Sequence, residues 1–166
     1  MKRLAQSIEA LAEKDENILR HARKIGAIRR NAAGELHTVC AELVGSLNAL
    51  LSDSAVALDP PAFHPDAFQE DGPNLFQINI RGRILQIEFE TSPELLSTED
   101  FRIPYTLMGS VRAFNQELLD KNLIEEQLVF YTLEGDKSLW RFFDARTYRS
   151  GTLDLDYLVT LLEQLL

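Results

Sequence analysis

The residues closest in type and spacing to a binding site are Arg20, Arg23, Lys24 and Arg30. They fall on the outer face of a predicted helix, and no acidic residue lies between Asn17 and Gly34. Ordered cations on a helix gain affinity for phosphates by releasing condensed counterions. The alternatives are a solvated helix face, which we favour, and a contact with an acidic protein. No aromatic residues are interleaved with these cations, which disfavours single-stranded nucleic acid.

Other candidate chemistry is incomplete. His37 and Cys40 lie three residues apart and would share one helix face, but a zinc site needs three or four ligands. His21 and His64 do not complete the set. The sequence has no phosphate-binding glycine-rich loop, dinucleotide-binding fingerprint or nucleophile elbow. We therefore assign no catalytic, cofactor-binding or metal-binding residues, and we expect a protein that is not an enzyme and has no cofactor.

The strongest pattern is a long amphipathic repeat that would position these side chains. From Leu4, apolar residues recur after four and then three positions for about forty-five residues, the spacing of a coiled-coil helix. Small or apolar residues at the e positions widen this seam into a face that suits a helical bundle. Asn31 and Gly34 flank two alanines, so a helical hairpin that breaks at Gly34 is the alternative to one continuous helix.

The apolar face of such a helix predicts self-association. The helix would be about 75 Å long, about twice the width of the remaining body, so its stripe must meet another surface. Asp15 and Arg29 occupy a positions on either side of Ala22. In an antiparallel homodimer that crosses near Ala22 they would lie close together; otherwise they mark places where the stripe reaches solvent. The predicted oligomer interface comprises Ile8, Leu11, Asp15, Ile18, Ala22, Ile25 and Arg29.

The rest of the chain predicts an antiparallel sheet. Residues 75–91 alternate apolar and polar side chains around Arg81-Gly82-Arg83, as in a hairpin that is buried on one face. Residues 105–119 are interpreted as a strand, with a helix as the alternative. Residues 123–133 and 137–146 form a second hairpin. Thr152 is predicted to cap a leucine-rich C-terminal helix that packs on the sheet.

These elements define an α+β fold with about five strands. The predicted regions are a long helix or helical hairpin over 1–51, a proline-containing linker or loop over 52–74, and a sheet with its C-terminal helix over 75–166. In overall shape, flanking helices around an antiparallel sheet in a small acidic chain resemble the bacterial secretion chaperones, dimers that hold other proteins.

Charge and composition limit the partners. The net charge is −9, yet residues up to 51 carry eight Lys and Arg against six Asp and Glu. This balance argues against a protein that mainly coats nucleic acid or an anionic membrane. One cysteine, Cys40, and no long apolar run favour a soluble cytoplasmic protein. We expect a homodimeric adaptor or chaperone-like module that contacts another protein; a nucleic-acid-associated regulator and a small-molecule sensor are the alternatives.

Overall fold

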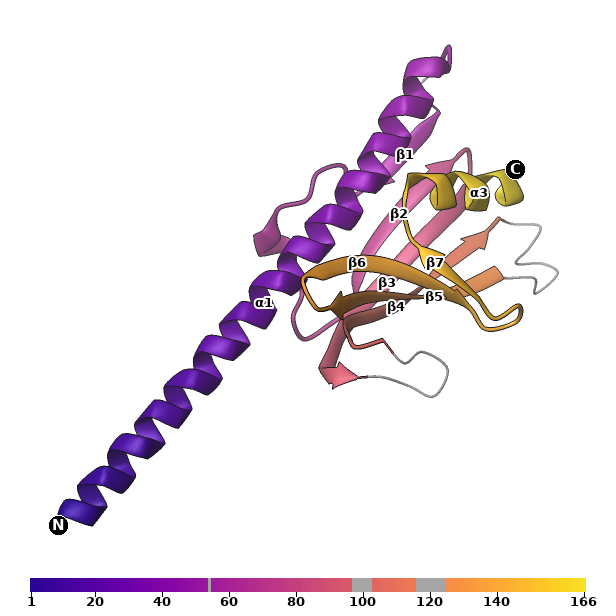
Figure 1. Cartoon of the computed structure of the whole chain (residues 1–166). Coiled ribbons are helices and arrows are strands. Elements are labelled where there is room, and N and C mark those ends of the chain that lie inside the picture. Colours follow the sequence, from indigo (N-terminus) through magenta and orange to yellow (C-terminus); the bar gives the residue numbers. More distant parts are fainter. Residues whose placement is uncertain (54, 97–102, 116–124) are drawn as a thin grey trace.

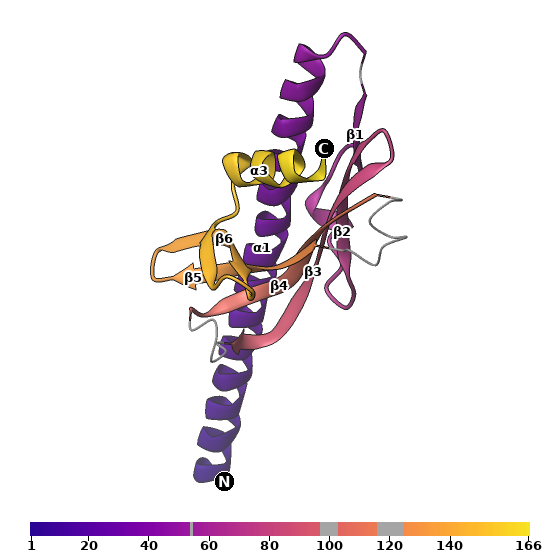
Figure 2. The same ribbon diagram turned by 90° about the vertical axis from the view of Figure 1, so that its right-hand side faces the viewer.

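The computed structural model describes residues 1–53, 55–96, 103–115 and 125–166. It is an α+β fold in which a long helix lies across one antiparallel sheet (Figure 1, Figure 2). The elements in chain order are α1 (Lys2–Leu50), β1 (Val56–Asp59), a 3-10 helix (Pro65–Ala67), β2 (Asn74–Ile80), β3 (Arg83–Leu96), β4 (Tyr105–Phe114), β5 (Glu125–Glu134), β6 (Lys137–Asp144), β7 (Arg149–Thr152) and α3 (Leu155–Leu165). The predicted long helix, antiparallel sheet and C-terminal helix are all present.

The sheet is a meander, because each strand pairs with its neighbours in the chain. β2 and β3 are joined through Arg81 and Gly82, whose φ angles are 51° and 89°. Two-residue hairpin loops favour such left-handed pairs because their twist matches that of the strands. The turn predicted at Arg81-Gly82-Arg83 is confirmed. The second hairpin is confirmed as well, since Glu134 pairs with Lys137.

The sheet has seven strands rather than the five expected from the sequence. β1 lies inside the segment 52–74 that was predicted to be a linker or loop, and β7 follows the last predicted hairpin. Each has only four residues. Their strand conformation comes from pairing with β2 and β6, because so short a segment carries little pattern of its own.

The segment predicted over 105–119 is a strand, not a helix: β4 covers Tyr105–Phe114, and residue 115 follows it outside any helix or strand. Residues 116–119 of this segment lie outside the described residues. Residues 123 and 124 of the next predicted strand also lie outside them, and β5 is described from Glu125 onward.

The helix α1 is continuous over 49 residues, so the hairpin that breaks at Gly34 is not formed. A glycine in a helix interior costs about 1 kcal/mol relative to alanine. Ala32, Ala33 and Leu36 are each at most 1% exposed, within the core cluster that the sheet also lines. Burial of this face offsets the cost of Gly34 and keeps the chain helical.

The two halves of α1 have different environments. Residues 2–24 are exposed on all sides and extend beyond the sheet (Figure 1), whereas the later turns contact the sheet and α3 (Figure 2). The buried residues of α1 are Gly26, Ala32, Ala33, Leu36, His37, Cys40 and Leu43. We call residues 2–24 the projecting segment, and β1 to β7 together with α3 the sheet body.

The core lies between the two helices and one face of the sheet. The predicted alternation is confirmed there, since the buried side chains of β2 and β3 are Phe76, Ile78, Leu85, Ile87 and Phe89. The C-terminal helix α3 buries four leucines, Leu158, Leu161, Leu162 and Leu165.

The cap of α3 differs from the prediction. Asp154 is the N-cap residue, and its Oδ1 accepts a hydrogen bond from the Tyr157 backbone N–H at 3.0 Å. Thr152, the predicted cap, is the last residue of β7. Thr152 pairs in β7, a strand that was not predicted from the sequence, so the helix begins two residues later and the Asp154 carboxylate caps it.

Candidate functional site

The projecting segment carries a stripe of apolar side chains in solvent. Leu4, Ile8, Leu11 and Ile18 are each between 57% and 61% exposed. Their spacing places them on one face of α1. The same spacing leads along the helix to Ala32 and Leu36, which are buried in the core. One continuous helix face is therefore covered in its second half and uncovered in its first.

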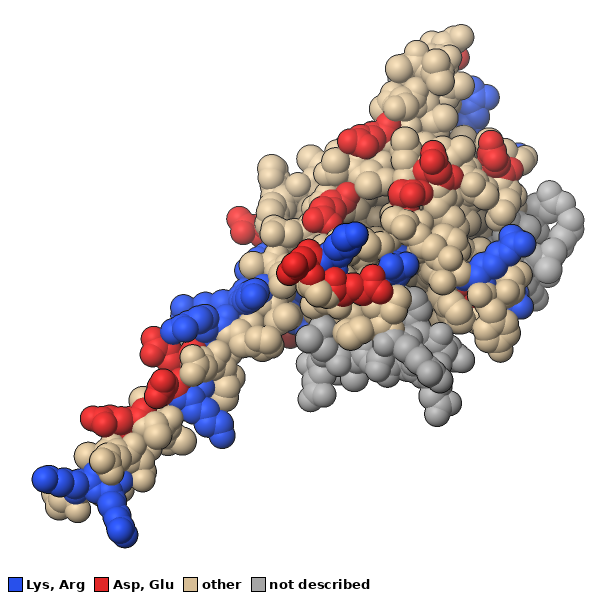
Figure 3. Space-filling view, in the orientation of Figure 1, with Lys and Arg blue, Asp and Glu red and all other residues tan. Residues whose placement is uncertain are grey.

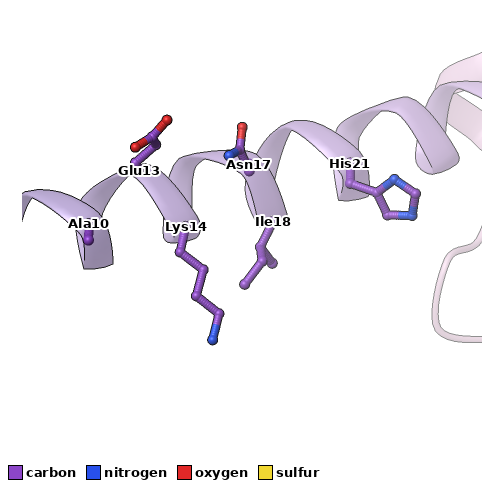
Figure 4. Close-up of a pocket in the computed structure, with 6 residues that line it drawn as sticks. All are labelled: Ala10, Glu13, Lys14, Asn17, Ile18 and His21. Atoms are coloured by element: carbon purple, nitrogen blue, oxygen red, sulfur yellow. The ribbon is translucent and has the colours of Figure 1, made fainter.

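A hollow on the projecting segment is lined by Ala10, Glu13, Lys14, Asn17, Ile18 and His21 (Figure 4). All of these residues belong to α1, and Figure 4 shows no other described element facing them. Ligand sites usually enclose most of a bound molecule. This hollow is part of an open helix surface, which suits an extended partner better than a small molecule.

Most residues of the predicted oligomer interface are exposed on the projecting segment, and one of them, Ile18, also lines the hollow. Ile8, Leu11, Asp15, Ile18 and Ala22 are all exposed. Ile25, at the junction with the sheet body, is partly covered. Asp15 makes no ion pair within the part of the chain that the structure describes.

Arg29, the remaining predicted interface residue, is bonded within its own chain. Its Nε donates to Thr106 Oγ1 at 2.9 Å, and its Nη2 donates to the Ser92 carbonyl oxygen at 2.7 Å. Its Nη1 also lies 3.6 Å from Glu70 Oε2. The side chain is only 16% exposed. Arg29 thus attaches α1 to the sheet body.

The four cations of the predicted basic patch form two groups. Arg20, Arg23 and Lys24 are exposed and make no ion pair with any residue in the described ranges. Arg30 lies 3.5 Å from Glu70 Oε1, so its charge is partly neutralised. Figure 3 shows acidic side chains between the cations at the tip of the helix and those near the sheet body. The structure therefore leaves a basic patch of three residues.

Further hydrogen bonds hold the second half of α1 on the sheet. Trp140 Nε1 donates to the carbonyl oxygen of Ala32 at 2.8 Å, and the Tyr131 hydroxyl donates to Glu35 Oε2 at 3.2 Å. Burial and the Glu35 carboxylate raise the pKa of Tyr131 to about 12, so this hydroxyl keeps its proton at neutral pH. Together with Arg29, these contacts fix the direction in which the projecting segment leaves the sheet body.

His37 and Cys40 both face the core. His37 Nε2 lies 2.8 Å from the Pro60 carbonyl oxygen, and its ring stacks on Phe63 with ring centres 5.7 Å apart. Cys40 is fully buried, and burial raises the pKa of its thiol to about 12. A protonated thiol is a poor nucleophile and a poor metal ligand. Within the described ranges, no cluster of three or more His, Cys, Asp or Glu is arranged to hold a metal.

A second hollow, which the sequence did not reveal, lies beside α3. Its volume is about 390 Å³, and its lining includes Phe142 and Asp144 of β6, Arg146 and Arg149 near the next turn, and Tyr157 of α3. These residues come from separate elements and share no periodic spacing. Arg146 and Arg149, three residues apart, were a weak signal of this site in the sequence.

Comparisons with models of known protein families, with curated proteins and with solved structures found no match for this chain. Across the described residues, no helix is long and apolar enough to cross a membrane. The functional inference therefore depends on the exposed stripe of α1 and on the hollow beside α3.

Proposed function

We propose that this protein is a non-enzymatic interaction module that forms homodimers through the projecting segment and contacts another protein through its acidic sheet body. The exposed apolar stripe carries the proposal. Leu4, Ile8, Leu11 and Ile18 remain more than half exposed, although the same helix face is buried farther along α1. Packing such a stripe against a second helix with matching spacing removes apolar surface from water and therefore stabilises the pair.

An antiparallel arrangement of two projecting segments fits the position of the sheet body. The body covers the stripe face from Gly26 onward. In a parallel pair, the two bodies would compete for the same space beyond that point. In an antiparallel pair that crosses at Glu13, each helix ends where the body of the other copy begins. In this arrangement the seam pairs residues of the two copies as follows: Leu4 of one copy lies opposite Ala22 of the other, Ile8 opposite Ile18, and Leu11 opposite Asp15.

This register replaces the crossing near Ala22 that the sequence suggests. The earlier register needs Arg29 to meet Asp15 of a second copy, whereas Arg29 already has Thr106 and Ser92 as partners in its own chain. The proposed interface therefore omits Arg29. Asp15 stays in the seam, where a polar residue lowers the stability of the pair but restricts its register.

The expected affinity is modest. Completing the burial of a Leu or Ile side chain that is now about half exposed contributes about 1 to 1.5 kcal/mol. Four such residues in each copy contribute about 8 to 12 kcal/mol, and association itself costs about 4 to 15 kcal/mol. The larger burial figure and the smaller association cost leave a net gain of about 8 kcal/mol, which corresponds to a dissociation constant of about 1 µM. A rigid helix that is already formed keeps the association cost at the low end of its range, so we expect a dissociation constant in the micromolar range.

The sheet body is the part that we propose to contact another protein. Beyond residue 51, the chain has nine Lys and Arg against twenty Asp and Glu. This excess of negative charge favours a partner with a basic surface, since complementary charge accelerates encounter and disfavours wrong partners.

Paired variants test whether the stripe is the dimer interface. Leu11→Asp/Ile18→Asp introduces two charges into the stripe, and Gln6→Asp/Ala27→Asp introduces two charges at exposed positions on the opposite face of α1. We expect the control to match the wild type in sedimentation velocity at about 100 µM, well above a micromolar dissociation constant, and the stripe variant to sediment as a monomer. Equal association of both variants would refute this interface.

Nucleic-acid binding is a second candidate, supported by the exposed side chains of Arg20, Arg23 and Lys24, which have no ion-pair partner among the described residues. It predicts that duplex DNA binds in fluorescence anisotropy and that affinity falls steeply between about 50 and 200 mM salt. Changing the three residues to Glu should abolish this binding, whereas Lys14→Glu, a change at another cation of the same segment, should reduce it much less. The candidate fails if duplex DNA does not bind at low salt.

A further inference from the structure

The hollow beside α3 has the polar and apolar groups of a ligand site. It lies between α3 and the strands β5, β6 and β7, and its volume of about 390 Å³ is within the usual range for small-molecule sites. Its lining includes Gln127, Phe142, Asp144, Arg146, Arg149 and Tyr157. Unlike the hollow on the projecting segment, it is bounded by a helix on one side and by strands on the other.

One wall is a pair of stacked aromatic rings. Phe142 and Tyr157 have ring centres 3.8 Å apart and an interplanar angle of 2°. Gly151, on the neighbouring strand β7, leaves room for this arrangement, because a Cβ atom at that position would lie 2.8 Å from Phe142 Cε1. The stacked pair holds the Tyr157 side chain in a fixed orientation beside the hollow.

Two polar atoms of this lining are buried without a partner. Tyr157 Oη and Gln127 Oε1 make no hydrogen bond with any residue that the structure describes. Leaving a buried polar atom unpaired destabilises a fold, so such atoms are uncommon and often mark functional positions. The phenol is a donor and the amide oxygen is an acceptor. A ligand that satisfies both would need an acceptor and a donor of its own.

The charge of the hollow is mainly positive. Asp144 is already engaged by its own turn, since Oδ1 accepts from the Arg146 backbone N–H at 2.9 Å and Oδ2 accepts from Thr147 Oγ1 at 3.0 Å. These bonds lower the pKa of Asp144. Burial and the Asp144 charge raise the pKa of Tyr157, which therefore remains a donor. Arg146 Nε lies 3.6 Å from Asp144 Oδ1, so Asp144 partly neutralises Arg146. Arg149 is exposed and has no ion-pair partner among the described side chains, so it supplies the uncompensated positive charge of the hollow.

We propose that this hollow binds a small organic anion, with its carboxylate or phosphate held by Arg146 and Arg149 and a neighbouring hydroxyl or amino group donating to Gln127 Oε1. Tyr157 Oη donates to an oxygen of the same molecule. Guanidinium groups suit both anions because their fixed donors match carboxylate and phosphate oxygens. This site is separate from the projecting segment and does not depend on dimer formation.

Isothermal titration calorimetry on the full chain tests the proposal with ribose 5-phosphate and malate as probes and ribose as the uncharged control. We expect at least one of the two anions to bind and ribose not to bind. The affinity for that anion should fall at least about tenfold in Arg149→Gln and in Tyr157→Phe, because each removes a hydrogen bond to a charged or buried group. Arg112→Gln, which removes an arginine that pairs with Glu126 outside the hollow, should leave the affinity unchanged.

Tyr157→Phe also separates a ligand role from a structural one. It preserves the stacked ring and removes only the unpaired hydroxyl, so the melting temperature without ligand should stay the same or rise. A fall in both melting temperature and affinity would indicate a structural role and overturn the assignment of Tyr157. If neither anion binds, or if binding persists unchanged in Arg149→Gln, the proposed site is wrong.

Discussion

The close contact between α1 and the sheet predicts that a larger side chain at Ala32 will destabilise the protein. Ala32 is 0% exposed, and its carbonyl oxygen accepts the hydrogen bond from Trp140 Nε1 at 2.8 Å. The strand cannot move away without losing this bond. Ala32→Leu adds three carbon atoms to a filled site, and overpacking of this kind costs about 1 to 3 kcal/mol.

Trp140 is the only tryptophan in the sequence, so its fluorescence reports directly on this contact. In urea unfolding followed by that emission, a loss of about 2 kcal/mol should lower the midpoint by about 1 M. Ala27→Leu places the same side chain at an exposed position on the opposite face of α1 and should change the free energy of unfolding by less than about 0.5 kcal/mol. Equal effects of the two substitutions would show that α1 does not pack on the sheet at Ala32.

Three further predictions concern the sheet body and the core. A Cβ at Gly109 would lie 2.0 Å from the Glu88 carbonyl oxygen, so Gly109→Ala should lower the free energy of unfolding by at least about 2 kcal/mol in urea titration. Asp154→Ala removes the cap of α3 and should cost about 1 kcal/mol in the same assay, whereas Asp154→Asn should retain most of the stability. Burial raises the pKa of the Cys40 thiol to about 12, so iodoacetamide at pH 8 should leave the folded protein unmodified and alkylate it in urea, as mass spectrometry will show.

Each of these predictions has an outcome that contradicts it. A Cβ at Gly45 would meet nothing within 4 Å among the described residues outside its own stretch of helix, so Gly45→Ala should instead stabilise α1 by up to about 1 kcal/mol. Similar effects at Gly45 and Gly109 would refute the close approach of β3 and β4. Equal losses in the Ala and Asn variants of Asp154 would refute capping. Rapid alkylation of folded Cys40 would show that its burial is incomplete or transient.

Local pattern was sufficient to predict the elements whose residues carry their own periodicity. The alternation of Phe76, Ile78, Leu85 and Ile87 identified a hairpin and its buried face, because period-two burial is visible in the sequence itself. The long apolar repeat identified α1. The short strands β1 and β7 were missed, because four residues paired at or near a sheet edge depend on their neighbours for their conformation.

The candidate sites depended on contacts between residues far apart in the chain. The length of the helix predicted that it would extend beyond the body, but the repeat did not show that the boundary between buried and exposed turns would lie at Ile25. Arg29 was expected to face a second copy, yet its partners Ser92 and Thr106 are 63 and 77 residues away. The hollow beside α3 combines β5, β6, β7 and α3, so no single segment of sequence contains its signature.

The most direct test of the central proposal is sedimentation equilibrium of the unmodified chain over about 1 to 100 µM, a range that brackets micromolar dissociation constants. The chain has a mass of 18.9 kDa. We predict that the apparent mass rises with concentration from this value toward twice this value. A mass that stays at 18.9 kDa over the whole range would contradict the proposal that the projecting segment pairs with a second copy.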